Sequence, residues 1–142
     1  MTFLLDVNVL IALSEPEHVF HEAAHLWFEA EGGRAWATCP LTENGFVRIV
    51  GNPRYLNTPG GPSAAAENLR AMRDHPGHVF WPDSVSLFDP LVDLAKITAP
   101  GQVTDAYLLA LAVRREGFLA TLDRRIDPAG VKGGAAALRM IA

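Results

Sequence analysis

Four acidic residues, widely separated in the chain, stand at positions suited to binding a cation. Asp6 and Asp123 each come directly after a short apolar run of strand type, and Glu43 and Asp105 fall in the first turn of predicted helices. Clustered carboxylates repel one another unless protons or a cation neutralise them. An oxygen-only site, with no Cys or His ligand, would suit Mg²⁺ or Mn²⁺ rather than Zn²⁺.

Alternating strand and helix patterns would bring these acids together. Strands are predicted at 3–5, 35–39, 78–81, 118–122 and 138–141. Helices are predicted at 7–13, 17–30, 41–50, 63–74, 87–97 and 104–116, with an exposed loop at 51–62. This order predicts an α/β fold, a three-layer αβα sandwich around a central parallel sheet of four to five strands. Ligands of such sheets bind at the carboxyl ends of the strands.

Each acid also has a plainer structural interpretation. A carboxylate in a helix first turn complements the helix dipole, which stabilises a helix by about 0.3–1 kcal/mol. Asp6 and Asp123 could likewise be helix caps or Asx-turn residues. The apolar neighbours of Asp6 and Asp105 favour a site, because they would desolvate a carboxylate that served only as a cap.

Composition predicts one soluble domain over residues 1–142. The hydrophobic content of 49% supports one compact core, and no internal repeat or low-complexity linker interrupts it. Neither a signal peptide nor a membrane span is predicted, and a cytoplasmic location is expected. Cys39 is the single cysteine, which excludes an intrachain disulfide and favours a buried apolar role.

The net charge of −4 does not exclude a nucleic-acid partner. Removing the four proposed metal-binding acids from the sixteen acidic residues leaves twelve, which equals the twelve Lys and Arg residues. The remainder of the molecule is therefore neutral before any bound cation is counted.

Four short stretches resemble the acidic motifs of PIN domains, and more narrowly those of the VapC toxins of bacterial toxin-antitoxin pairs. They are LLDVNVL at 4–10, TENGFVR at 42–48, TDAYL at 104–108 and LATLDR at 119–124. Any one motif is weak, but all four occur in order and the resemblance covers essentially the whole chain. One departure is Asn8, where other members often carry serine or threonine.

The resemblance implies a metal-dependent endoribonuclease. Asp6 and Asp105 would be the most direct ligands of Mg²⁺ or Mn²⁺, with Glu43 and Asp123 completing the site directly or through water. One or two such ions would activate a water against an RNA phosphate, so no nucleophilic side chain is needed. The residues expected to orient the carboxylates are Asn8, Thr104 and Thr121.

The resemblance also implies partners. A small cognate antitoxin would cover the acidic cleft, the substrate would be RNA, and the chain would form a homodimer. Arg114, Arg115, Arg124 and Arg125 follow two of the acids and are candidates to hold RNA phosphates. A solvated helix end and a solvated turn are an equally good interpretation of these arginines.

Residues 21–25 formally match the zinc-protease pattern H-E-x-x-H, in which His21 and His25 would bind metal and Glu22 would act as the base. The apolar residues of 17–30 instead predict an amphipathic helix with its histidines on a solvated face. The apolar residues of this helix are Val19, Phe20, Ala23, Leu26, Trp27 and Ala30, and its polar stripe is His18, Glu22, His25 and Glu29.

Two further alternatives remain open. Asp6 could be the nucleophile of a small phosphatase, although the second acid of that motif is here Asn8. The chain could also be a binding or scaffold module that keeps its acids for stability. Its large aromatic residues are predicted to pack in the core rather than to stack on bases, namely Phe20, Trp27, Trp36, Phe80 and Trp81.

Overall fold

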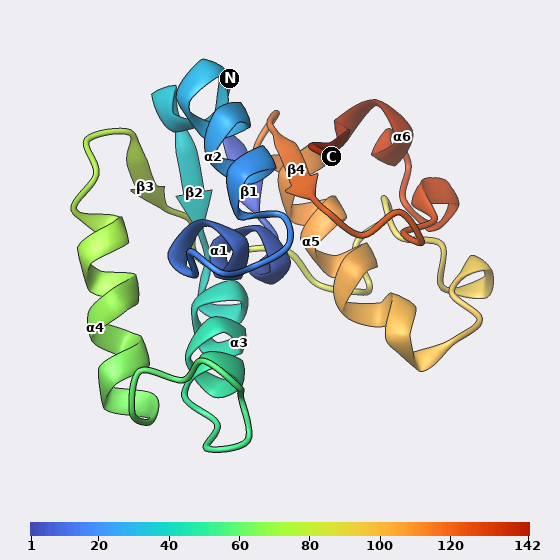
Figure 1. The fold of residues 1–142 in the computed structure, drawn as a ribbon. Coiled ribbons are helices and arrows are strands. Elements are labelled where there is room, and N and C mark those ends of the chain that lie inside the picture. Colours follow the sequence, from blue (N-terminus) through green and yellow to red (C-terminus); the bar gives the residue numbers. More distant parts are fainter.

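A computed structural model describes all 142 residues (Figure 1). The strands are β1 Phe3–Leu5, β2 Trp36–Thr38, β3 His78–Phe80, β4 Phe118–Thr121 and β5 Leu138–Met140. The α-helices are α1 Val7–Ser14, α2 His21–Ala30, α3 Pro40–Val50, α4 Pro62–Arg73, α5 Val103–Arg114 and α6 Gly134–Ala137. Single 3-10 turns are η1 Gly32–Arg34, η2 Leu94–Lys96, η3 Pro100–Gln102 and η4 Pro128–Gly130.

The five strands form one parallel sheet in the order β3-β2-β1-β4-β5. The central strand β1 pairs with β2 on one side and with β4 on the other. The chain therefore builds outward from β1 through β2 to β3 and then crosses back to β4. This reversal of strand order beside β1 is where parallel α/β sheets bind their ligands.

Successive side chains of each strand point to opposite faces of the sheet, and an apolar core lies on each face. In β1, Phe3 and Leu5 pack among α1, α2, α3 and α4, whereas Leu4 packs against α5. In β4, Ala120 faces the first core and Leu119 the second. Figure 1 shows α3 and α4 on one side of the sheet and α5 and α6 on the other. The predicted three-layer fold with a parallel sheet is therefore confirmed.

The predicted elements are present within one or two residues of their expected bounds, with two exceptions. The helix expected at 17–30 begins only at His21, and the helix expected at 87–97 does not form. Instead the carboxylates of Asp89 and Asp93 accept hydrogen bonds from the backbone N–H groups of Leu91 and Ala95. Such local turns compete with helical hydrogen bonds, and this explains why only the 3-10 turn η2 remains.

The predicted amphipathic pattern of residues 17–30 is only partly confirmed. Trp27 packs against the core as expected, but other members of the apolar stripe do not. Val19 and Leu26 are 84% and 61% exposed, whereas Ala24 is fully buried. His21 and His25, expected on the solvated face, lie against the end of α1, with ring nitrogens 2.7 Å from the Ala12 carbonyl oxygen and 3.0 Å from that of Leu13. Helices commonly leave their last carbonyls without internal partners, and the two imidazoles meet this need.

None of the helices is both long enough and apolar enough to cross a membrane.

Candidate active site

Asp6 lies where the central strand ends and α1 begins. Its backbone N–H donates to the Ala120 carbonyl at 2.9 Å, so the end of the β1–β4 ladder fixes its position. Its extended backbone makes it the N-cap of α1, and its carboxylate accepts a 2.8 Å hydrogen bond from the Val7 N–H. The side chain is only 8% exposed, and this burial raises the pKa of Asp6 above its usual value.

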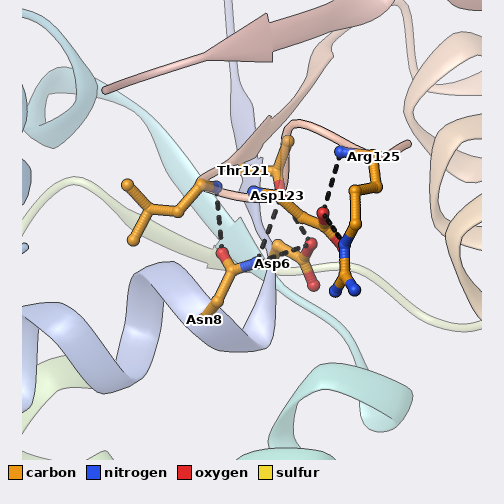
Figure 2. Close-up of polar contacts among 6 residues, drawn as sticks. Asp6, Asn8, Thr121, Asp123 and Arg125 are labelled. Atoms are coloured by element: carbon orange, nitrogen blue, oxygen red, sulfur yellow. Dashed lines mark hydrogen bonds and ion pairs between the residues drawn. The ribbon is translucent and has the colours of Figure 1, made fainter. Parts of the chain in front are cut away.

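Thr121 and Asn8 hold the carboxylate of Asp6 in one orientation (Figure 2). The Thr121 hydroxyl donates to Asp6 Oδ2 at 2.8 Å, and the Asn8 amide nitrogen lies 3.4 Å from the same oxygen. The Leu122 N–H donates to Asn8 Oδ1 at 3.1 Å, which sets the amide so that its NH₂ group faces Asp6. Both residues therefore contact the carboxylate that they were predicted to orient.

Asp105 stands in the first turn of α5 and shares the electrostatic environment of Asp6. Burial and, to a smaller extent, the negative charges of Asp6 and Asp123 together raise the pKa of Asp105 to about 6. A carboxyl group with this pKa is costly to ionise in the fold, as expected for acids that face one another without a sufficient counter-charge.

Asp123 follows β4 on the other side of this acidic group. Its carboxylate accepts hydrogen bonds from the backbone N–H and the Nε of Arg125, at 2.9 Å and 3.1 Å. These two donors lower the pKa of Asp123. Arg125 is therefore the one candidate arginine that lies at the acidic group, and Figure 2 shows it beside Asp123.

Glu43 lies at the same edge of the sheet, in the first turn of the helix that follows β2, but its carboxylate is engaged elsewhere. It accepts a 2.7 Å hydrogen bond from the Thr38 hydroxyl and lies 3.3 Å from a guanidinium nitrogen of Arg73. Since the Thr38 proton points to Glu43, His78 Nε2, 2.8 Å from the same hydroxyl, must be the donor to it. Burial and the charge of Arg73 lower the pKa of His78, so this ring is neutral near pH 7.

The structure thus brings Asp6, Asp105 and Asp123 into mutual electrostatic contact and leaves Glu43 one strand away in its own ion pair. No three His, Cys, Asp or Glu side chains are gathered closely enough to coordinate an ion as they stand. The donor set is nevertheless composed of carboxylate oxygens alone. The raised pKa of Asp105 reflects burial first and then repulsion from Asp6 and Asp123, which a hard cation would relieve.

The other predicted residues lie outside this group. Arg114 and Arg115 end α5, roughly 14 Å along the helix from Asp105 at 1.5 Å per residue. Arg114 pairs with Asp89 at 2.6 Å, and Arg115 lies over the Trp81 ring. Arg124 donates to the Ala142 carbonyl oxygen at 2.6 Å, and Thr104 is exposed with no hydrogen bond to any of the four carboxylates.

Sequence reasoning missed Thr38, Arg73 and His78, which surround Glu43. Thr38 had a usable signal, because it is the last residue of a buried strand and precedes the acid-bearing helix, much as Thr121 precedes Asp123. Arg73 and His78 had none, since their contacts depend on how α4 and β3 return to α3.

The zinc-protease alternative fits the structure poorly. The ring nitrogens of His21 and His25 that face α1 are bonded to backbone carbonyls, and the rings contact each other with centroids 4.3 Å apart. No third metal-binding side chain is gathered with them.

Comparison with known proteins now identifies the family. The model of the PIN domain matches residues 3–132. This chain belongs to the PIN-domain family. Within that family it is similar to three proteins of Mycobacterium tuberculosis. Ribonuclease VapC44 is 46% identical over 136 residues, covering 94% of each chain. Ribonuclease VapC39 is 43% identical over 134 residues, covering 94% of this chain and 96% of the relative. Ribonuclease VapC38 is 48% identical over 120 residues, covering 84% of each.

The pKa of Asp105 predicts how this PIN domain responds to pH. Its folded pKa of about 6 exceeds the ordinary value of 3.8, so between these values the folded chain binds more protons than the unfolded chain. The free energy of unfolding therefore falls as pH rises through this window and stays lowered above it. In EDTA, Asp105→Asn should raise the melting temperature near pH 7, with the gain disappearing at about pH 4.

Thermal unfolding followed by circular dichroism measures this effect. Glu29→Gln, at an exposed carboxylate on α2, is the matched control and should leave the melting temperature unchanged. A melting temperature of Asp105→Asn below that of the unmodified chain near pH 7 would mean that this acid serves stability.

Proposed function

We propose that this PIN domain is a Mg²⁺- or Mn²⁺-dependent endoribonuclease that hydrolyses RNA phosphodiester bonds at the carboxyl edge of its sheet. The observation that carries the proposal is the buried Asp6 in electrostatic contact with Asp105, whose pKa is raised to about 6 by burial and by neighbouring carboxylates. Membership of the PIN-domain family and similarity to proteins named ribonucleases support it.

Four carboxylates would hold the metal. Asp6 and Asp105 are the most direct candidates, and Asp123 and Glu43 would complete the site directly or through water. When bound, Mg²⁺ or Mn²⁺ supplies Lewis-acid activation of a water and neutralises charge on the leaving 3′ oxygen. The chain's own residues prepare the site: Thr121 and Asn8 fix the Asp6 carboxylate through their hydrogen bonds.

We further propose that the chain is the toxin of a VapBC-type pair. A cognate small antitoxin would then bind over the acidic edge, because a guanidinium or other cationic group is attracted to carboxylates that lack a full counter-charge. The family resemblance also supports a homodimer.

Incubation with total RNA tests the nuclease proposal. The purified chain should cut RNA with Mg²⁺ or Mn²⁺ and not with EDTA, and mapping of the new ends should give discrete sites. Asp6→Asn and Asp105→Asn should each lower the cleavage rate by about 100-fold or more, because each removes a carboxylate that would hold the metal. Glu29→Gln, at an exposed carboxylate on α2, should cut at the unmodified rate. RNA cleavage that persists in EDTA, or in Asp6→Asn, would contradict the proposal.

Thr121→Val tests the orientation of Asp6. Valine keeps the buried shape at this fully buried position but cannot donate the 2.8 Å hydrogen bond to Asp6. We expect the cleavage rate to fall by about 10- to 100-fold, as found for residues that orient metal ligands. Thr121→Ser, which keeps the hydroxyl, should retain most of the activity. Equal rates for the two variants would show that the hydroxyl has no part in orienting Asp6.

A further inference from the structure

A cavity of about 680 Å³ opens beside Glu43, between α3 and α4. Figure 1 shows α3 continuing beyond the end of β2 and α4 running alongside it, joined by the loop at 51–61. The volume falls within the range of small-molecule and nucleotide sites. Most of its lining is polar, including Glu43, Asn44, Arg70, Arg73, Asp74 and His78.

Arg73 links this cavity to the carboxylates. Its guanidinium lies 3.3 Å from Glu43 and also over the ring of Phe80, 5.5 Å from the centroid. The Arg73 side chain remains 42% exposed, so part of it is accessible to a ligand. An arginine in this position can exchange the partly buried Glu43 carboxylate for a phosphate, which its fork of donors matches equally well.

Phe80 is an exposed aromatic side chain next to this cavity. It was predicted to pack in the core, yet it ends the edge strand β3 with 43% of its surface exposed. The face of its ring contacts the guanidinium of Arg73. An exposed ring beside an arginine, at the edge that carries the acids, is the combination with which proteins stack unpaired bases and hold their phosphates.

The side chains that line the cavity indicate which kind of ligand it could bind. The cavity is too polar to favour an apolar ligand. Arg70 supplies a second guanidinium on the same helix, and its only ion pair, with Glu67, joins side chains that are 70% and 65% exposed. Such surface pairs are weak, so Arg70 is available to an anion as well.

Release of Arg73 would leave Glu43 in position. The Thr38 hydroxyl, itself held by His78, still donates to the Glu43 carboxylate when the guanidinium turns away. Transfer of Arg73 from Glu43 to a phosphate would therefore leave the Glu43 Oε2 atom with its hydrogen bond from Thr38, and the side chain would stay in place.

We propose that the α3–α4 cavity and Phe80 together bind single-stranded RNA beside the Glu43 edge of the site, with Arg73 contacting a phosphate and Phe80 stacking on a base. This inference rests on the proposed function and extends it from the reacting phosphate to a neighbouring nucleotide. A flexible single strand, rather than a duplex, is required, because the base must be unstacked to reach Phe80.

RNA binding by an inactive chain tests the inference without any metal. The parent is full-length Asp6→Asn in EDTA, and fluorescence anisotropy follows a labelled short single-stranded oligoribonucleotide of mixed sequence. Adding Phe80→Leu, which stays apolar but cannot stack, should weaken binding at least about fivefold. Adding Arg73→Gln should weaken it and reduce the slope of log K against log[salt] by about 0.7, the value for one phosphate contact on a single strand.

Arg34→Gln is the matched control, since Arg34 is an exposed arginine before β2, where the strand begins rather than where it ends. It should leave the affinity unchanged. Both test positions are exposed, and an unchanged circular dichroism spectrum will verify that each variant is folded. If one variant unfolds, the RNA affinity of the other variant tests the inference. Parent-like RNA affinity in a folded Arg73→Gln or Phe80→Leu variant would overturn the inference.

Parallel cleavage of total RNA by the unmodified chain separates this inference from the proposed function. Cleavage together with parent-like binding by both variants would overturn the inference and leave the nuclease proposal standing. Weakened binding by both variants without cleavage would support the RNA-binding surface and overturn the nuclease proposal. If the variants bind RNA normally but lose a co-expressed partner protein, the cavity is a protein-binding site and the inference is wrong.

Discussion

The repulsion among carboxylates at the end of the central strand is the constraint on which this structure depends. Asp6 is held in a nearly closed site by hydrogen bonds from Val7 and Thr121, which compensate its desolvation. Those donors do nothing for its neighbour Asp105, whose pKa is raised to about 6. The fold therefore preserves a group of acids that is costly in the free chain and that the proposed binding of a cation would make favourable.

The parallel sheet makes this convergence unavoidable. Because β1 is central and the strand order reverses beside it, the residues after β1 and β4 and the start of α5 meet at one edge. The neighbouring strand β2 brings Glu43 to the same edge, where Arg73 partly neutralises it. The two inner aspartates have no such partner, so the charge is least balanced where the reaction would occur.

The sequence was sufficient to predict most of the fold and the inner part of the site. Apolar runs that end in Asp6 and Asp123 locate two acids, since the strands are parallel and buried on both faces. It could not predict that Glu43 is paired with Arg73 rather than with the other acids, because this ion pair depends on how α4 returns beside α3. Nor could it predict that Phe80 is exposed, because an apolar edge strand has the same residue pattern whether or not a helix covers it.

The effect of Mg²⁺ on thermal unfolding tests the central claim most directly. If a cation relieves the repulsion, Mg²⁺ should raise the melting temperature of the unmodified chain above its value in EDTA, by an amount equivalent to about 2.7 kcal/mol at roughly 100 times Kd. In Asp6→Asn, which removes the most buried charge, this rise should largely disappear. An equal melting temperature in Mg²⁺ and EDTA, or an undiminished rise in Asp6→Asn, would contradict the account.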